Sequence, residues 1–400
     1  MEEAYEVEIP CHFLCPISMQ LMKDPVTVST GITYDRENIE KWLFSHKNPT
    51  CPVTKQALFN TDLTPNHTLR RLIQAWCTLN SIERIPTPKP PVDRSQIVKL
   101  LNEAKNSPKS QLICLQRLRS IARRNENSKN HLQAAGGVHF LLSIVRKNED
   151  AFSRDEALSL LQEIELSDSD LKTFLSENGG ILDSLIQVLE TGNCQNRAVA
   201  IMLLKSAFYV ADPADLIGSR PELFTQIVHI LRDRISQQAT KAALKLLVEL
   251  CPWGRNRIKA MDAGAVAALI ELLLETADRR ACELVLTVLD QLCGCAEGRA
   301  ELLRHGGGLA VVSKKILRVS HAASERGVRI LSSISKYSAN SRVLQEMLQV
   351  GVVSKLCLVL QVEASLKTKE RAKEILRLHS RVWRDSPCIP PHLLSSYPST

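Results

Sequence analysis

The sequence is poor in aromatic residues, which make up 4% of it, although hydrophobic residues reach 44%. The apolar side chains are therefore mostly Leu, Ile, Val and Ala, which pack well between helices. At 400 residues the chain also exceeds the length at which a single hydrophobic core usually stops growing. These features predict a mainly α-helical protein that contains several domains or a repeat array.

Long uninterrupted hydrophobic runs are lacking as well. No stretch approaches the roughly 18 consecutive apolar residues that a membrane-spanning helix requires. The first six residues, MEEAYE, are acidic and lead into no apolar segment, so we expect no signal peptide. The expected location is the cytoplasm, with no membrane span.

Neither sign of charge dominates the chain. It has 51 basic and 43 acidic residues, a formal net charge of +8, and the two signs are interspersed along most of its length. Such a modest excess is typical of a solvated surface, so we expect no nucleic-acid partner.

Metal-binding cysteine patterns are also missing. Twelve cysteines occur, but no two of them form a C-x-x-C pair. The cysteines and histidines near the N-terminus do not follow the paired spacing of a zinc module; they are Cys11, His12, Cys15, His46, Cys51, His67 and Cys77. We therefore expect reduced thiols, no metal and no other cofactor.

Proline marks two boundaries in the chain. Four prolines within residues 83–93 favour an extended linker, which separates a domain at residues 8–82 from a helical array at residues 94–384. Four more prolines and several serines occupy residues 385–400 and predict a flexible C-terminal tail.

The second part of the chain repeats with a period near 42 residues. Glycine-led breaks recur in steps of 42 to 45 residues, or twice that, at Gly136, Gly179, Gly264, Gly306 and Gly351. Residues 219–223 stand where one further break is expected. This period is typical of HEAT and armadillo repeats. Glycine allows a sharp turn there because it adopts positive φ without steric cost.

Each break lies between a short amphipathic segment and a longer apolar one. A third helical segment follows, such as residues 281–292, in which Leu284, Val288 and Leu292 form one stripe. This order resembles armadillo repeats over about residues 95–383, with six to seven units. The resemblance implies stacked helices that form a continuous core and an extended groove.

The N-terminal domain contains the most specific signal. Six short blocks occur in a fixed order: FLCPI (13–17), LMKDPV (21–26), GITYDR (31–36), IEKWL (39–43), CPVT (51–54) and LTPNHTL (63–69). Together they resemble the U-box, a RING-like domain without zinc. With the array behind it, the chain resembles the plant U-box/armadillo class of E3 ubiquitin ligases.

The residues of this domain also predict local structure by themselves. Asp24-Pro25 and Gly31 bracket a short strand at residues 26–28, and its partner begins at residues 31–33. Asp35 and Asn38 suit the start of a helix, where their side chains would bond free backbone donors. The prediction is a β-hairpin, one helix and two loops.

In the U-box family, hydrogen bonds and ion pairs hold the two loops where RING domains place zinc. The resemblance implies this structural role for Asp24, Tyr34, Asp35, Arg36, Glu37 and Asn66. Ordinary capping and turn chemistry is the alternative for each of them.

The resemblance also implies a surface that binds an E2 ubiquitin-conjugating enzyme. The matching positions are Ile17, Met19, Trp42 and Pro52, and an apolar cluster of this kind is usual in small interfaces. Trp42 and Met19 could instead belong to the core. Lys55 matches a basic linchpin that contacts both the E2 and its ubiquitin, although Arg is commoner there.

Such a ligase would position ubiquitin, carried by the E2, for attack by a lysine of a substrate held by the repeats. The family resemblance suggests substrate degradation and a role in plant stress or immune signalling; self-association stays open. A ligase with its own cysteine nucleophile is disfavoured because no base lies beside Cys11, Cys15 or Cys51 in the sequence.

Two further functions remain as rivals. An armadillo adaptor whose U-box has lost E2 binding would have a degraded E2 surface, but Ile17, Trp42 and Pro52 are present. Nuclear import is disfavoured, because the array lacks the Trp-x-x-x-Asn ladder of import receptors.

Overall fold

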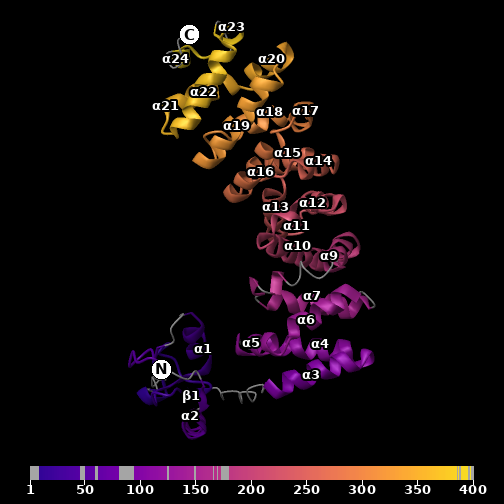
Figure 1. Cartoon of the computed structure of the whole chain (residues 1–400). Coiled ribbons are helices and arrows are strands. Elements are labelled where there is room, and N and C mark those ends of the chain that lie inside the picture. Colours follow the sequence, from indigo (N-terminus) through magenta and orange to yellow (C-terminus); the bar gives the residue numbers. More distant parts are fainter. Residues whose placement is uncertain are drawn as a thin grey trace, which may run out of the picture. The chain divides into compact units, whose positions relative to one another are not determined.

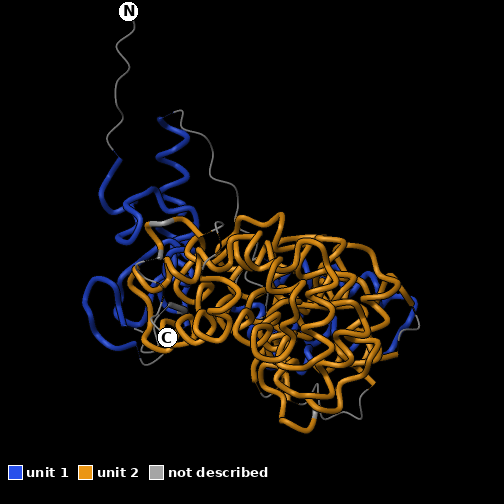
Figure 2. Tube along the Cα trace, turned by 90° about the horizontal axis from the view of Figure 1, so that it is seen from above, with its two compact units in different colours: residues 1–138 blue, residues 139–400 orange. Residues whose placement is uncertain are grey.

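The computed structural model describes residues 9–45, 50–58, 62–80, 94–123, 126–147, 150–164, 166–168, 170–172, 180–384, 386, 389–394 and 397. These residues are mostly helical, so the predicted fold class is confirmed. The chain divides into two compact units, residues 1–138 and 139–400 (Figure 2). The predicted linker, residues 83–93, lies outside the described residues.

The N-terminal module combines a small sheet with two helices. Its elements are η1 (Cys11–Phe13), β1 (Pro25–Thr27), β2 (Thr33–Asp35), α1 (Arg36–Ser45), β3 (Thr64–Pro65) and α2 (His67–Leu79). The strands are antiparallel in the order β2-β1-β3, with Val26 opposite both Tyr34 and Pro65. The predicted hairpin and first helix are confirmed, and Gly31 turns the hairpin with a φ of 81°.

Helix α2 and strand β3 were not predicted from the sequence. The signal for α2 was present, because Asn66 is a good N-cap residue and Leu69, Ile73 and Cys77 follow at helical spacing. Ile73 and Cys77 are buried in the core of the module. That core consists of Phe13, Cys15, Met22, Val26, Val28, Tyr34, Ile39, Cys51, Leu58, Ile73 and Cys77.

The rest of the described chain is a series of helices. In the first unit these are α3 (Arg94–Asn106), α4 (Pro108–Ala122) and α5 (Glu126–Ala134). Helix α6 (Gly137–Lys147) spans the boundary between the two units. In the second unit they are α7 (Ala151–Glu163), α9 (Gly180–Thr191), α10 (Cys194–Tyr209), α11 (Pro213–Ile217), α12 (Pro221–Asp233), α13 (Gln237–Leu250), α14 (Gly254–Asp262), α15 (Ala265–Glu275), α16 (Arg279–Leu292), α17 (Ala296–Arg304), α18 (Gly308–Lys315), α19 (His321–Tyr337), α20 (Ser341–Gln349), α21 (Val352–Gln361), α22 (Leu366–Leu378), α23 (Ser380–Trp383) and α24 (Pro391–Leu394).

No single helix in the described ranges is long and apolar enough to cross a membrane. Helices α20 and α21 meet the criteria only as a pair, and they are bent by 63° at their junction.

The third helix of each repeat stacks on the third helix of the next. In the second unit α10 packs against α13, α13 against α16, α16 against α19, and α19 against α22. Figure 1 shows α10, α13, α16 and α19 in succession along one side of this unit. We call the exposed side of α10, α13, α16, α19 and α22 the third-helix face.

A polar side chain caps the start of the third helix in every repeat from α7 to α22. The caps of α7, α10, α13, α16, α19 and α22 are Asp150, Asn193, Ser236, Asp278, Ser320 and Ser365. Each accepts a hydrogen bond from a backbone N–H of the first turn, which satisfies a donor that the helix itself leaves free. The caps recur 43, 43, 42, 42 and 45 residues apart, so they share the period of the glycine breaks.

The glycine breaks use two different geometries. Gly136, Gly264 and Gly351 have φ values of 74°, 79° and 75°, as the sequence predicted. At the Gly306 break no positive φ occurs, and Gly308 instead permits a close approach, because a Cβ there would lie 2.1 Å from the Leu302 carbonyl oxygen. Gly179 lies outside the described residues.

The C-terminal segment differs from the expected flexible tail. Where it is described, Ile389 and Leu393 are buried, and the Tyr397 hydroxyl donates to the Leu376 carbonyl at 2.8 Å. Trp383 is fully buried and donates to the Leu344 carbonyl at 3.1 Å. The last repeat has no following repeat to cover it, so its apolar end is covered by these residues.

Alanine substitutions at three glycines should separate the two break geometries. Gly306→Ala should be nearly neutral, because its φ is ordinary and its Cβ would meet nothing within 4 Å. Gly351→Ala should cost about 1 kcal/mol through its positive φ alone. Gly308→Ala should cost about 2 to 3 kcal/mol, because the turn into α18 must shift. Urea unfolding followed by circular dichroism measures this order, and equal losses at Gly306 and Gly308 would contradict it.

Candidate functional site

Loop 1 of the N-terminal module, residues 15–20, is a tight hydrogen-bonded turn. The Cys15 N–H donates to the Gln20 carbonyl, and the Met19 N–H donates to the Cys15 carbonyl, both at 2.8 Å. Met19 has a φ of 55° and a side chain that is 70% exposed. The turn therefore holds an apolar side chain out in solvent from an unusual backbone conformation.

Loop 2, residues 51–56, has the same structure. The Cys51 N–H donates to the Gln56 carbonyl at 2.8 Å, and the Lys55 N–H donates to the Cys51 carbonyl at 2.9 Å. Lys55 has a φ of 59° and is exposed. Lys55 thus occupies in loop 2 the position that Met19 occupies in loop 1.

A buried sulfur lies at the base of loop 1. Cys15 has no solvent exposure, and its Sγ accepts from the Asp35 backbone N–H at 3.3 Å and from Asn38 Nδ2 at 3.7 Å. Asn38 Nδ2 also donates to Ser18 Oγ at 3.0 Å. The start of α1 is therefore bonded to loop 1 through polar contacts.

A second buried sulfur lies at the base of loop 2. Cys51 Sγ accepts from Thr30 Oγ1 at 3.3 Å and lies 3.1 Å from the Tyr34 hydroxyl. That hydroxyl accepts from the Val53 N–H at 3.2 Å. Burial raises the pKa of the Cys51 thiol, but hydrogen bonds from Thr30, Thr54 and Tyr34 outweigh this effect and bring the pKa to about 6. Burial and the bond to Cys51 raise the pKa of Tyr34.

The Asp35 carboxylate holds the segment that joins loop 1 to the sheet. Its Oδ1 accepts from the backbone N–H groups of Lys23 and Asp24, both at 2.8 Å. Arg36 Nε forms an ion pair with Asp24 Oδ2 at 2.7 Å, and the Arg36 N–H donates to the Asp24 carbonyl. Charge-assisted bonds of this kind are stronger than neutral ones and fix the segment in one arrangement.

This arrangement corrects the capping role expected of Asp35 and Asn38. The residues by themselves predicted that both side chains would cap the first helix, whereas the U-box resemblance implied that Asp35 helps to hold the loops. In the structure their bonds run to loop 1 and its flank, across 11 to 23 residues of sequence. Cap residues and long-range acceptors have the same chemistry, so the sequence could not distinguish the two roles.

Asn66 connects the sheet to α2. Its side-chain oxygen accepts from the Leu69 N–H at 3.0 Å, and its Nδ2 lies 3.5 Å and 3.4 Å from the hydroxyls of Thr27 and Thr33. Those two hydroxyls are themselves 2.9 Å apart across the β1–β2 pair. Asn66 is therefore both the cap of α2 and a bridge between strands.

Glu37 lies apart from these contacts. It forms an ion pair with Lys41 at 2.6 Å on the exposed side of α1, and the hydrogen bond from Lys41 lowers the pKa of Glu37. Its bond stays within one helix and contacts neither loop. Of the six residues expected in the structural set, five make long-range contacts, namely Asp24, Tyr34, Asp35, Arg36 and Asn66.

The residues expected to bind an E2 lie at the edge of the same core. Ile17 and Trp42 are partly buried and pack against it, and Pro52 is half-buried. Trp42 Nε1 donates to the Thr50 carbonyl at 2.9 Å, and the Lys55 ammonium lies 5.5 Å from the centre of the Trp42 ring. The structure thus brings Trp42 and Lys55 together, although they are distant in sequence.

The cysteines in the loops are poorly placed for covalent catalysis. Cys15 and Cys51 have no solvent exposure, so a bound thioester could not reach their sulfurs. Among the described residues no group of three or more His, Cys, Asp or Glu side chains is arranged to hold a metal ion. The arrangement suits binding and positioning of another protein.

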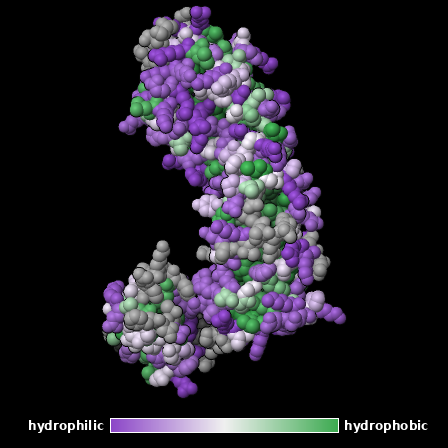
Figure 3. Space-filling model, viewed as in Figure 1, coloured by the Kyte–Doolittle hydropathy of each residue, from purple (hydrophilic) through white to green (hydrophobic). Residues whose placement is uncertain are grey.

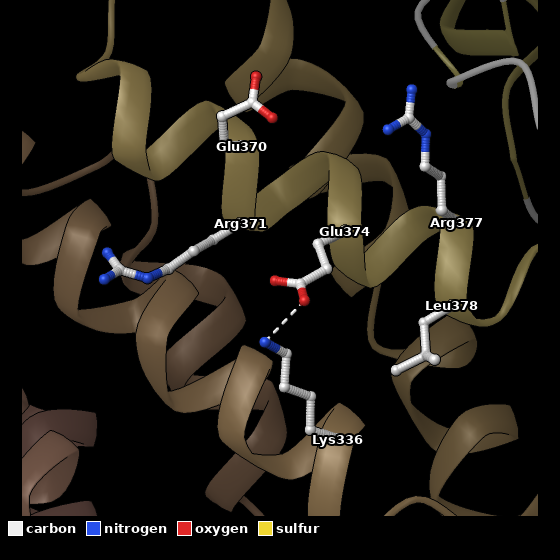
Figure 4. Close-up of a pocket in the computed structure, with 6 residues that line it drawn as sticks. All are labelled: Lys336, Glu370, Arg371, Glu374, Arg377 and Leu378. Atoms are coloured by element: carbon white, nitrogen blue, oxygen red, sulfur yellow. Dashed lines mark ion pairs between the residues drawn. The ribbon is translucent and has the colours of Figure 1, made fainter.

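A second candidate surface lies at the C-terminal end of the third-helix face. A cavity of about 830 Å³ is lined by Lys336 of α19 and by residues of α22, among them Glu374 and Arg377. Figure 4 shows Lys336 pointing toward Glu374, with an ion-pair distance of 2.8 Å. Hydrophilic residues cover this end of the array in Figure 3. It offers charged groups of both signs to a bound chain.

The fold and the loops together define a U-box module followed by armadillo repeats, and sequence comparisons agree. The family profile for the U-box domain matches residues 9–82, and the profile described as "Plant U-box protein ARM repeat region" matches residues 96–399. This chain belongs to the plant U-box proteins with armadillo repeats, and it is an E3 ubiquitin ligase, a ubiquitin transferase.

Three curated proteins of Arabidopsis thaliana are similar over nearly the whole chain. The E3 ubiquitin-protein ligase PUB23 is 54% identical, with 98% of both chains covered. PUB22 is 50% identical, with 98% of this chain and 99% of that one covered, and PUB24 is 40% identical, with 98% and 97% covered.

One solved structure supports the repeat fold. It comes from work on a phosphorylation switch in the interaction between cadherin and beta-catenin, and it aligns with a TM-score of 0.57. The alignment covers 80% of this chain and 58% of that one at 14% identity, so the likeness concerns the fold alone.

Removing the Asp35 carboxylate should loosen loop 1, whereas removing that of Glu37 should not. Asp35→Ala leaves two backbone donors without their acceptor, and we expect a loss of about 2 kcal/mol in the stability of the module. Glu37→Ala is the matched control on the exposed side of α1, with an expected change within about 0.5 kcal/mol. Hydrogen exchange of residues 13–35 in the full chain measures both, and equal protection in the two variants would contradict the assignment.

Chelation should leave the module folded and active. Because hydrogen bonds hold both loops, excess EDTA or 1,10-phenanthroline should change neither the melting temperature nor the rate of ubiquitin discharge from a charged E2. Stoichiometric zinc in the purified protein, with unfolding on its removal, would show that metal holds the loops instead.

Proposed function

We propose that loops 1 and 2, together with Trp42, form the surface that binds a ubiquitin-charged E2. The main support for this proposal is that the two loops have the same structure. They present Met19 and Lys55 at equivalent positive-φ positions above buried, hydrogen-bonded sulfurs. Positive φ is uncommon outside glycine, and it clusters at functional sites when the surrounding structure holds it in place. Preorganised loops lose little conformational freedom when a partner binds.

Ile17, Pro52 and Trp42 are the apolar anchors of this surface. They are only partly buried in the free chain, so they retain apolar area that a partner can cover. Met19, with 70% of its side chain exposed, adds an adaptable contact at the tip of loop 1. A handful of such residues usually carries most of the binding energy of a small interface.

Lys55 is the positioning residue of the proposed mechanism. Its ammonium is exposed and lies near the ring of Trp42, which keeps the charge at the edge of the E2 surface. From there it can hydrogen-bond carbonyl groups of both the E2 and the ubiquitin. Fixing ubiquitin against the E2 holds the thioester carbonyl open to attack by a lysine amine, with no covalent bond to this chain.

The armadillo repeats hold the protein substrate in this proposal. We place it on the third-helix face, where exposed side chains of successive repeats form a continuous surface. The family resemblance supports degradation of the modified substrate, a role in plant stress or immune signalling and a cytoplasmic location. Substrate half-life in plant cells with and without this chain, together with cell fractionation, tests that part of the proposal.

Substitutions on the two loops should separate E2 binding from ubiquitin transfer. Ile17→Ala and Pro52→Ala should each weaken E2 binding by roughly thirtyfold, because loss of a central anchor costs about 2 kcal/mol. Lys55→Ala should leave E2 binding nearly unchanged but slow the discharge of ubiquitin, since its contact with ubiquitin forms only in the reactive arrangement. Lys55→Arg should be at least as active as the parent.

The matched control is Lys41→Ala, which removes an exposed lysine of α1 that pairs with Glu37. It should change neither E2 binding nor discharge. Titration calorimetry and single-turnover discharge to free lysine give the two readouts. Parent-like discharge by Lys55→Ala would remove its positioning role, and failure of a folded wild-type chain to stimulate any E2 would favour the adaptor function instead.

A further inference from the structure

Several cations on the third-helix face meet a carboxylate from a neighbouring repeat. Arg326 and Arg329 of α19 both pair with Asp290 of α16, whose side chain is only 7% exposed. The other such pairs are Arg197–Asp233, Lys241–Asp278, Lys336–Glu374 and Arg371–Glu325. Opposite charges therefore link successive repeats along the array.

Lys205 of α10 and Lys245 of α13 break this pattern. They lie 40 residues apart, about one repeat, on two helices that pack against each other. Burial and, second, the positive charge of Lys245 lower the pKa of Lys205. Within the part of the chain that the structure describes, neither ammonium forms a hydrogen bond or an ion pair. Lys205 and Lys245 stand 12 and 9 residues after the caps of their helices. Asp290 and Arg329 stand at the same two positions of α16 and α19 and are in contact at 2.8 Å. A cation from one repeat therefore faces a cation from the next.

This juxtaposition is unfavourable in the free protein. Lys205 is half-buried, so part of its hydration is lost, and a like charge nearby disfavours the charged form further. An anion placed between the two ammonium groups would reverse both effects, because it would pair with two cations at once. The surface is therefore better suited to an anionic partner than to solvent.

The residues around Lys205 point to a protein partner. Met202 and Tyr209 lie three residues before and four residues after it, so all three side chains share one side of α10. Met202 is half-buried, and Tyr209 is 79% exposed at the last residue of the helix. An exposed aromatic ring beside a charged group is a common anchor for a peptide chain.

We propose that Lys205, Lys245, Met202 and Tyr209 form a docking site for an acidic peptide segment of the substrate. One carboxylate of the segment bridges the two ammonium groups, and an apolar residue beside it covers Tyr209 and Met202. This assignment rests on the proposed function, in which the third-helix face holds the substrate, and it adds the chemical class of the segment that is recognised.

Peptide binding to the full chain tests the site without any E2. The probe is a fluorescein-labelled peptide of eight glutamates with a central leucine and tyrosine, and its anisotropy is read at about 50 mM salt. We expect the glutamate peptide to bind at least tenfold more tightly than the same peptide with glutamine at the acidic positions. The double variant Lys205→Met/Lys245→Met, which keeps the aliphatic stems, should lose at least tenfold in affinity.

The matched control is Lys99→Met/Lys314→Met, which removes two exposed lysines of α3 and α18, helices that are not part of the third-helix face. It changes the net charge equally and should bind the glutamate peptide within twofold of the parent. Equal losses of peptide affinity in the two double variants would show that only the net charge of the protein matters, and would overturn the site. Tighter binding of a DNA oligonucleotide than of the glutamate peptide would also overturn it, in favour of a nucleic-acid surface.

Thermal stability provides a second, independent readout. Lys205→Met alone should raise the melting temperature of the free protein, because it removes the half-buried cation from beside Lys245. A lower melting temperature would show that Lys205 is not unfavourably placed. Wild-type protein that discharges ubiquitin from an E2 but does not bind the glutamate peptide would contradict the docking site alone. Wild-type protein that binds the peptide but discharges no ubiquitin would contradict only the proposed E2 surface.

Discussion

The bond from Asp35 to two backbone amides of the preceding segment is the constraint on which the N-terminal module depends. A domain of this size has only a small hydrophobic core, which cannot hold the loops by packing alone, so the loops need a further restraint. Asp35 holds the flank of loop 1, and its own N–H reaches the buried sulfur of Cys15. Tyr34, the residue before it, reaches the sulfur of Cys51 under loop 2. One short strand thereby ties both loops to the same sheet.

The repeat array depends on a different constraint, which acts once in every repeat. Each third helix from α7 to α22 begins with a capping side chain, and several of the turns before the longer helices require a glycine. These local features fix where each helix starts, and stacking then buries its apolar side against the next repeat. Because contacts run mainly between neighbours, the array can vary the charges on its exposed third-helix face with little effect on its core.

The two parts serve the proposed mechanism in complementary ways. The module offers a small, rigid surface in which Trp42 orders loop 2 through the Thr50 carbonyl and also faces Lys55. The array offers a long surface on which several charges pair between repeats, with Lys205 and Lys245 among the cations that do not. In the proposed mechanism, ubiquitin is transferred while the two surfaces hold their partners at the same time.

The sequence by itself determined the class of the protein. Ordered motifs and a 42-residue period can be recognised from neighbouring residues alone, because they do not depend on which distant residues come into contact. It predicted the hairpin, the first helix and the repeat helices, and it identified the U-box residues that the structure places in and around the two loops. It did not reveal which backbone donors the Asp35 carboxylate holds, that Asn38 bonds to loop 1, that Glu37 pairs within its own helix, or that the C-terminal segment packs on the last repeat. Those outcomes, and the meeting of Lys205 with Lys245, were decided by tertiary structure, since they depend on which distant groups packing brings within a few ångströms.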